Sequence, residues 1–255
     1  MSSPSSLPLL LFDVDGTLTV PRLSMTPEMR VFMEDVRAKG VPLAVVGGSD
    51  LSKVVEQLGN SLDDVTSRFD YVFTENGLVG FKGKDALPVG SIQDELGEDK
   101  LQKLINHVLD HFSKLELPRK RGNFVEFRKG MLNLCPIGRS CSYEERLEFN
   151  AYDNEHGVRQ KLVDELMSEF GHYNIEVAIG GQISVDVYPK GWDKTYCLRY
   201  LTDNYPTIHF FGDKTSKGGN DYAIYEDSRT IGHSVKSPED TKEQVESLLK
   251  QIGVL

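Results

Sequence analysis

The sequence predicts an α/β protein in which a doubly wound, mostly parallel sheet is interrupted by an inserted α+β domain with an antiparallel sheet. Apolar strands alternate with amphipathic helices up to about residue 85, the alternation then stops, and it returns after residue 188. Alternating strands and helices are typical of parallel sheets, whereas a change of pattern indicates another domain. We therefore expect a core domain of residues 1–85 and 189–255 and an inserted domain of residues 86–188.

The first part of the core domain is expected to run strand, helix, strand, helix, strand. The apolar runs that suit strands buried on both faces are residues 9–14, 43–46 and 71–74. The first helix begins after Thr26, which can cap it, and ends before Gly40. The second helix covers residues 51–58 and stops at Gly59.

The inserted domain mixes helices with two antiparallel hairpins. An apolar stripe predicts a helix over residues 101–112, and Ser142 with Glu145 forms a capping box that opens another. A further helix is expected at 158–170, with hairpins at 123–136 and 175–188. The core then resumes with a helix at 193–201, strands at 208–211 and 231–235, and a final helix that begins at Ser237.

Composition excludes several classes of protein. The 255 residues carry a net charge of −10, and a general nucleic-acid binder would instead show a basic excess. No apolar run approaches the roughly 20 residues that cross a membrane. The three cysteines lack C-x-x-C spacing, which predicts reduced thiols and a cytoplasmic protein.

Acidic residues follow two of the expected strands. Asp13 and Asp15 close the first strand, and Asp213 closes a later one. Ligands of open α/β sheets bind beyond the carboxyl ends of the strands, and carboxylate oxygens without His or Cys suit Mg²⁺. A calcium loop is excluded, because its sixth position would be Leu18 rather than glycine. Asp-x-Asp-Gly alone is more often a polar turn, but the complete set of strand-end residues favours a metal site.

The chemical interpretation of this set is phosphoryl transfer. Asp13 would attack phosphorus, and Asp15 would exchange a proton with the substrate. Ser49, after the second strand and at a helix start, would hold phosphate oxygens, while Lys194 would neutralise charge. Two alternatives remain open: Ser49 as an N-cap only, and Lys194 as a surface lysine.

These motifs resemble the haloacid dehalogenase superfamily of phosphotransferases. The resemblance to eukaryotic phosphomannomutases is closer and covers nearly the whole chain. It is carried by residues 12–19, 46–50, 75–77, 121–122, 136–142, 180–184, 191–194, 211–215 and 218–221. It implies a haloacid dehalogenase-like core with an inserted cap domain. It also implies a Mg²⁺-dependent interconversion of mannose 6-phosphate and mannose 1-phosphate, which supplies GDP-mannose for glycosylation, and a homodimer joined through the cap.

A mutase needs a second site for a phosphate. Its intermediate is a hexose 1,6-bisphosphate, so one phosphate always lies away from the catalytic acids, and arginine binds phosphate bidentately. Residues 119–146 carry seven basic and three acidic residues, although a solvated basic face explains this as well. The resemblance implies that substrate is bound by Arg22, Arg128, Arg139, Arg146, Ser184 and Asp186. It further implies a second cation site at Tyr225, Asp227 and Thr230.

Two other functions remain open from the sequence. The first is a Mg²⁺-dependent sugar-phosphate phosphatase, in which water accepts the phosphoryl group. Three arginines in the inserted domain favour a mutase, because a monophosphate has no second phosphate to bind. The second is a sugar-phosphate sensor without catalysis, which the retained acids argue against.

Overall fold

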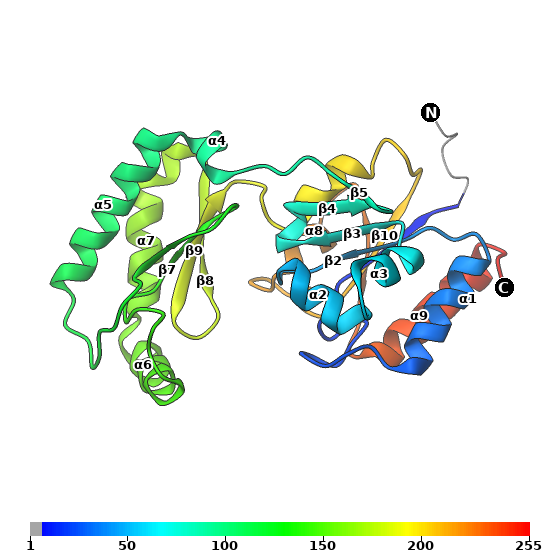
Figure 1. Ribbon diagram of the computed structural model, residues 1–255, viewed down its shortest axis with the longest axis horizontal. Helices are drawn as coiled ribbons and strands as arrows, with labels where there is room; N and C mark the ends of the chain where they lie inside the picture. The colour runs from blue at the N-terminus through cyan, green and yellow to red at the C-terminus, as the bar shows by residue number, and fades with distance from the viewer. Residues whose placement is uncertain (1–6) are drawn as a thin grey trace. The chain divides into compact units, whose positions relative to one another are not determined.

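A computed structural model describes residues 7–255; residues 1–6, which begin the predicted core domain, lie outside the described part (Figure 1). The chain divides into two compact units. Unit 1 runs up to Val89 and resumes at Gly191, and unit 2 runs from Gly90 to Lys190.

Both boundaries differ by a few residues from the predicted ones. Ala86, which the sequence placed in the inserted domain, pairs with Phe81 in the sheet of unit 1. Pro189, which was expected in the core, pairs with Ile175 in the sheet of unit 2. The prediction followed a change in apolar pattern, and short strand ends at a sheet edge carry too few residues to show such a pattern.

Unit 1 contains a seven-stranded sheet in the order β11-β10-β1-β2-β3-β4-β5. Its strands are β1 Leu9–Phe12, β2 Leu43–Val46, β3 Tyr71–Thr74, β4 Val79–Lys82, β5 Asp85–Ala86, β10 Ile208–Gly212 and β11 Ile231–Ser234. Its helices are α1 Pro27–Ala38, α2 Leu51–Leu58, α3 Leu62–Arg68, η1 Glu75–Gly77, η3 Lys194–Tyr200, α8 Tyr222–Tyr225 and α9 Pro238–Gln251. The first five strands in this order are parallel, whereas β4 and β5 are antiparallel.

The central strands β1, β2, β3 and β10 are buried on both faces. Alternate residues of each strand point to opposite sides of the sheet. Leu10 and Phe12 pack with α1, α2 and α9, while Leu9 and Leu11 pack with η3 and α8. Figure 1 shows α1 and α9 side by side in unit 1. Continuous apolar strands are therefore required, as the sequence predicted.

Unit 2 contains a four-stranded antiparallel sheet in the order β6-β7-β9-β8. Its strands are β6 Val125–Phe127, β7 Leu132–Leu134, β8 Ile175–Gly180 and β9 Ser184–Pro189. Its helices are α4 Ile92–Leu96, α5 Glu98–Lys114, α6 Tyr143–His156, α7 Val158–Phe170 and η2 Gly171–Tyr173. Residues of α5 and α7 form one core with Leu132, Leu134, Val185 and Val187, which leaves the other face of β7 and β9 for polar side chains.

These features confirm the predicted fold class, a mostly parallel core with a separate antiparallel sheet. The caps also agree, because Thr26 accepts a hydrogen bond from the Met29 amide and Ser142 forms a capping box with Glu145. Sequence patterns missed α3, α4, β4 and β5, which are short. Within residues 7–255, no helix has the length and apolar character that a membrane span requires. The three cysteines are unpaired.

Candidate active site

Three neighbouring parallel strands of unit 1 end at one edge of the sheet. Asp13 follows β1, residues 47–49 follow β2, and Asp213 follows β10. A pocket lies at this edge, lined among others by Asp13, Asp15 and Ser49 together with Lys214. The residues predicted from strand ends are thus brought together by the sheet.

Lys194 lies directly beside Asp13, one of the residues that line this pocket. The side chain is fully buried, and its ammonium group forms an ion pair with Asp13 and a second one with Asp221, at 2.6 Å. Burial disfavours the charged amine, but the two carboxylates more than offset this, so the pKa of Lys194 lies above its usual value. The surface-lysine interpretation is therefore wrong.

Asp13, Asp213 and Asp221 form a carboxylate cluster. One oxygen from each lies within 4.8 Å of the others. Burial raises the pKa of Asp13 and the pKa of Asp213, although Lys194 acts against both shifts. Asp13 and Asp221 are buried and Asp213 is half-buried. Three such close carboxylates repel one another, and this donor set fits a hard divalent cation.

Gly16 makes the close approach of Asp213 possible. Its φ of +83° lies in the left-handed region, and a Cβ at this position would overlap the Asp213 carboxylate. The glycine of the Asp-x-Asp-Gly motif therefore shapes the cluster directly.

The carboxylate of Asp15 lies outside this cluster. Its Oδ1 accepts hydrogen bonds from the Arg22 backbone amide at 2.6 Å and from Gln57 Nε2 at 2.8 Å. Partial burial acts to raise the pKa of Asp15, but these two donors, together with the charges of Lys53 and Lys214, outweigh it and lower the pKa. The Arg22 side chain itself is exposed. A role of Asp15 at the metal stays a prediction, as does substrate binding by Arg22.

Ser49 lies between β2 and α2 and is half-buried. Asp50, not Ser49, caps α2, because the Asp50 side chain accepts a hydrogen bond from the Lys53 amide at 3.0 Å. The N-cap interpretation of Ser49 is therefore wrong. The backbone carbonyl of Ser49 accepts a hydrogen bond from the Glu75 amide at 2.9 Å, which fixes the loop at the pocket that Ser49 lines.

The residues of the predicted second cation site lie at the end of α8 and in the loop that follows it. Both carboxylate oxygens of Asp227 accept hydrogen bonds from Arg229, at 2.8 and 2.6 Å. The Thr230 hydroxyl donates to the Ile224 carbonyl at 2.5 Å, and Tyr225 ends the helix. Metal binding here stays a prediction.

In unit 2, the polar face of the sheet carries a chain of contacts that we call the polar network: Glu126, Arg128, Asn133, Arg139 and Asp186. Neighbouring strands place Asn133 opposite both Glu126 and Asp186. Asn133 donates to Asp186 at 2.5 Å and accepts from Arg139 at 2.8 Å. Glu126 accepts from Arg128 at 2.6 Å and pairs with Arg139 at 2.9 Å. Three predicted substrate residues are thus linked.

The remaining two predicted substrate residues of unit 2, Ser184 and Arg146, do not belong to the polar network. Ser184 is buried, and its hydroxyl donates to the Gly180 carbonyl at 3.0 Å. Arg146 lies half-exposed on α6. Burial raises the pKa of Asp186, although Asn133 and the nearby arginines act against the shift.

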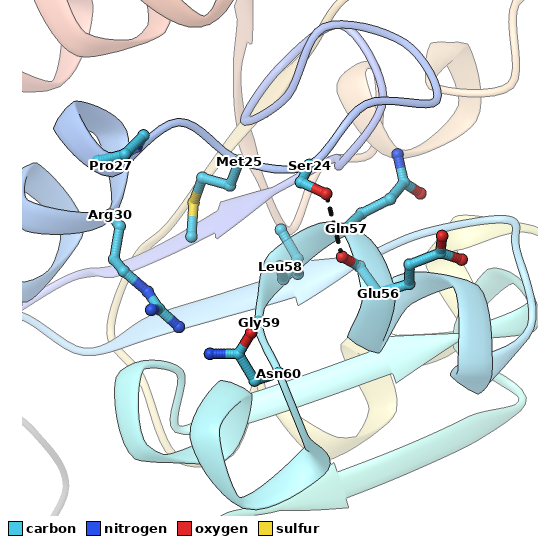
Figure 2. Close-up of a pocket in the computed structure, with 9 residues that line it drawn as sticks. All are labelled: Ser24, Met25, Pro27, Arg30, Glu56, Gln57, Leu58, Gly59 and Asn60. Carbon is cyan, nitrogen blue, oxygen red and sulfur yellow. Dashed lines mark hydrogen bonds between the residues drawn. The ribbon is translucent and has the colours of Figure 1, made fainter.

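Sequence reasoning missed Gln57, Glu126 and Asn133. Asn133 is a polar residue within an otherwise apolar buried run, and this exception was the available signal. Gln57 follows the exposed Glu56 in a mixed helical sequence, which gave no such signal. Gln57 also lines a second pocket with Met25, Arg30 and Asn60, shown in Figure 2. Arg30 is ion-paired with Asp64, and no residue of the carboxylate cluster lines this second pocket. We therefore assign no catalytic role to it.

Comparison with known proteins decides the family. The sequence profile described as eukaryotic phosphomannomutase matches residues 29–251. The chain belongs to this family. It is 58% identical to a probable phosphomannomutase of Caenorhabditis elegans over 99% of this chain and 100% of that one. It is likewise 58% identical to a phosphomannomutase of Dendrobium officinale, over 96% of both chains.

Solved structures outside the family share the fold. An IMP-nucleotidase of Plasmodium falciparum with IMP bound has a TM-score of 0.62 at 18% identity, covering 96% of this chain and 68% of that one. A Thermoplasma acidophilum protein has a TM-score of 0.56 at 15% identity, covering 98% and 99%. At these identities the likeness concerns the fold alone.

Proposed function

We propose that this eukaryotic phosphomannomutase family member interconverts mannose 6-phosphate and mannose 1-phosphate. The observation that carries the proposal is 58% identity to phosphomannomutases over nearly full length. The phosphatase alternative is not favoured, because these relatives are named as mutases and match in unit 2 as well as in unit 1.

In the proposed reaction Asp13 attacks the phosphorus of a hexose 1,6-bisphosphate. A P–O bond forms to Asp13 while the bond to the sugar oxygen breaks, and Asp15 gives that oxygen a proton. That monophosphate leaves, and the isomeric monophosphate binds with its free hydroxyl towards phosphorylated Asp13. The hydroxyl oxygen attacks phosphorus while the bond to Asp13 breaks, and Asp15 takes the proton back. The bisphosphate that forms turns over and loses its other phosphate to Asp13. Lys194 supports this role of Asp13, because it is buried beside the nucleophile and offsets phosphate charge.

Asp13, Asp213 and Asp221 would hold Mg²⁺ with their carboxylate oxygens, and Asp15 would complete the site. When bound, the ion offsets charge on the phosphate and on the carboxylates. Ser49 would donate its hydroxyl to phosphate oxygens at the start of α2. The second cation site at Tyr225, Asp227 and Thr230 is part of the same proposal.

The arginines of unit 2 would bind the phosphate that is not reacting. A bisphosphate requires a second dianion site, and guanidinium groups bind phosphate bidentately. The residues proposed for this site are Arg128, Arg139 and Arg146. Ser184, Asp186 and Arg22 would contact the substrate as well. Hexose 1,6-bisphosphate would thus be both intermediate and activator.

The cellular setting belongs to the proposal too. We infer a cytoplasmic homodimer joined through residues 86–188, whose product supplies GDP-mannose for glycosylation. Exposed apolar side chains of unit 2, Tyr143 and Leu147 on α6 among them, support a contact surface there.

The experiment mixes the protein with mannose 1-phosphate, Mg²⁺ and a catalytic amount of hexose 1,6-bisphosphate. We expect mannose 6-phosphate to appear, with little inorganic phosphate. Stoichiometric release of inorganic phosphate without the 6-phosphate would contradict the proposal and indicate a phosphatase.

A further inference from the structure

We propose that Gln57 is a positioning residue for Asp15: it fixes one oxygen of the carboxylate so that the other exchanges the proton with the sugar oxygen. The inference rests on the proposed role of Asp15 as acid and base. Gln57 itself is not proposed to contact any reacting atom. Its effect is exerted through Asp15.

Gln57 is an unusual residue for its position. It lies on α2 next to Leu58, and its side chain is only 3% exposed, although glutamine is mostly a surface residue. Figure 2 shows its amide turned away from Arg30 and Asn60, which line the neighbouring pocket. Gln57 also lines the pocket that contains Asp13 and Asp15.

The geometry separates the two oxygens of Asp15. Oδ1 accepts both hydrogen bonds, from Gln57 Nε2 at 2.8 Å and from the Arg22 amide at 2.6 Å. Among residues 7–255, no side chain or backbone donor is hydrogen-bonded to Oδ2. Two fixed donors on Oδ1 restrict rotation of the carboxylate, and such restriction keeps a proton-transfer group within reach of its target. Oδ2 is then the oxygen left for proton exchange.

The other end of the Gln57 amide is unsatisfied. Its Oε1 is buried and has no hydrogen-bond partner among the described residues. An unpaired buried carbonyl oxygen destabilises the folded state, so a glutamine kept for structure alone would be expected to use both ends. The Nε2 end of the amide donates to Asp15, and this favours a role of Gln57 in the reaction.

A structural role is the competing explanation. Gln57 Nε2 also lies 3.4 Å from Thr19 Oγ1 and 3.4 Å from the Leu23 carbonyl, so it ties the loop after Asp15 to α2. The two explanations differ in one respect. A positioning residue for proton transfer matters only where the leaving group needs a proton, whereas a structural residue matters for every substrate.

The test compares two phosphate esters in the variant Gln57→Met, which keeps the size of the side chain and removes the amide. Sugar phosphates need a proton on the departing oxygen. With p-nitrophenyl phosphate, the P–O bond to the aryl group breaks as a bond to Asp13 forms, and p-nitrophenolate leaves without a proton. Release of p-nitrophenolate in a single turnover, with enzyme in excess, therefore measures attack by Asp13 alone. Glu56→Gln, on the same helix, is the matched control.

We expect Gln57→Met to lower kcat for mannose phosphate turnover about 10- to 100-fold, with KM within about twofold. The single-turnover release of p-nitrophenolate should stay within about twofold of the wild type, and Glu56→Gln should change neither rate. Equal losses with both esters, or no loss with mannose phosphate, would overturn the proposal.

The outcome is separable from the proposed function. If the wild type hydrolyses mannose 1-phosphate instead of isomerising it, the departing sugar oxygen still needs its proton. The same comparison is then made on that hydrolysis. A result that contradicts the mutase proposal can thus be told apart from a result that contradicts the role of Gln57.

Discussion

Lys194 forms a buried ion pair with Asp13, although 181 residues separate them in the sequence. The pair joins the first strand of unit 1 to the short helix η3 that follows the return of the chain from unit 2. Asp221 completes the arrangement with a second ion pair to the same ammonium group, at 2.6 Å. A single buried amine thus compensates two carboxylates, of which Asp221 is fully buried and Asp13 nearly so.

Replacing Lys194 with methionine should therefore destabilise the fold. Removing one partner of a buried ion pair leaves an uncompensated charge, at a cost of about 3–5 kcal/mol. Urea unfolding measures this free energy. Lys250→Met, at an exposed position of α9, is the control and should cost less than about 0.5 kcal/mol. Similar unfolding midpoints for the two variants would show that Lys194 does not stabilise the carboxylates.

Mg²⁺ should stabilise the protein through the carboxylate cluster. An ion that binds only the folded state with a Kd of about 1 mM adds about 1.4 kcal/mol at about 10 mM. Thermal unfolding with Mg²⁺ and with a chelator measures the gain without any assay of activity. In Asp213→Asn, which loses one charged ligand, the gain should fall to less than about half. An undiminished gain in this variant would place the ion elsewhere.

The sequence could predict those site residues that follow strands, because parallel strands bring their carboxyl ends to one edge. Asp13 and Asp213 were found in this way. Gln57 and Asn133 were not, because their contacts depend on how a helix or a neighbouring strand is registered against them. The fold was predictable where apolar patterns were long, as in α1 and α7, and not in short edge strands such as β5.

Arg146→Ala tests the second phosphate site. Losing a bidentate contact to a dianion should lower mutase turnover at least about 10-fold. Hydrolysis of p-nitrophenyl phosphate, which has no second phosphate, should change by less than about twofold. Arg119→Ala is the matched control, since Arg119 is exposed and paired with Glu148. Equal losses in both assays for Arg146→Ala would argue against a role at the distal phosphate.

Acid should destabilise the protein through a histidine pair in the sheet. His209 Nδ1 and His233 Nε2 lie 2.8 Å apart, and His233 stacks on Phe211. Burial, together with His209, lowers the pKa of His233 to about 4. Below its usual pKa of 6.5 the unfolded chain binds a proton that the folded chain does not, so stability falls between about pH 6.5 and 4.

For partly solvated rings this loss amounts to about 1 kcal/mol between pH 7 and pH 5. Urea unfolding at the two pH values measures it in the wild type and in His233→Gln, whose amide can keep the contact with His209 but does not titrate. The pH-dependent loss should shrink in the variant. The same loss in both proteins would assign the acid sensitivity to other groups.

The central claim is that the phosphoryl group is carried by Asp13. The most direct measurement adds hexose 1,6-bisphosphate with radiolabelled phosphate, quenches the reaction in acid during turnover, and maps the label by proteolysis. We predict label on the peptide that contains Asp13 and none in Asp13→Asn, which should be folded but inactive. A wild-type enzyme that turns over mannose phosphates without labelling this peptide would contradict the account.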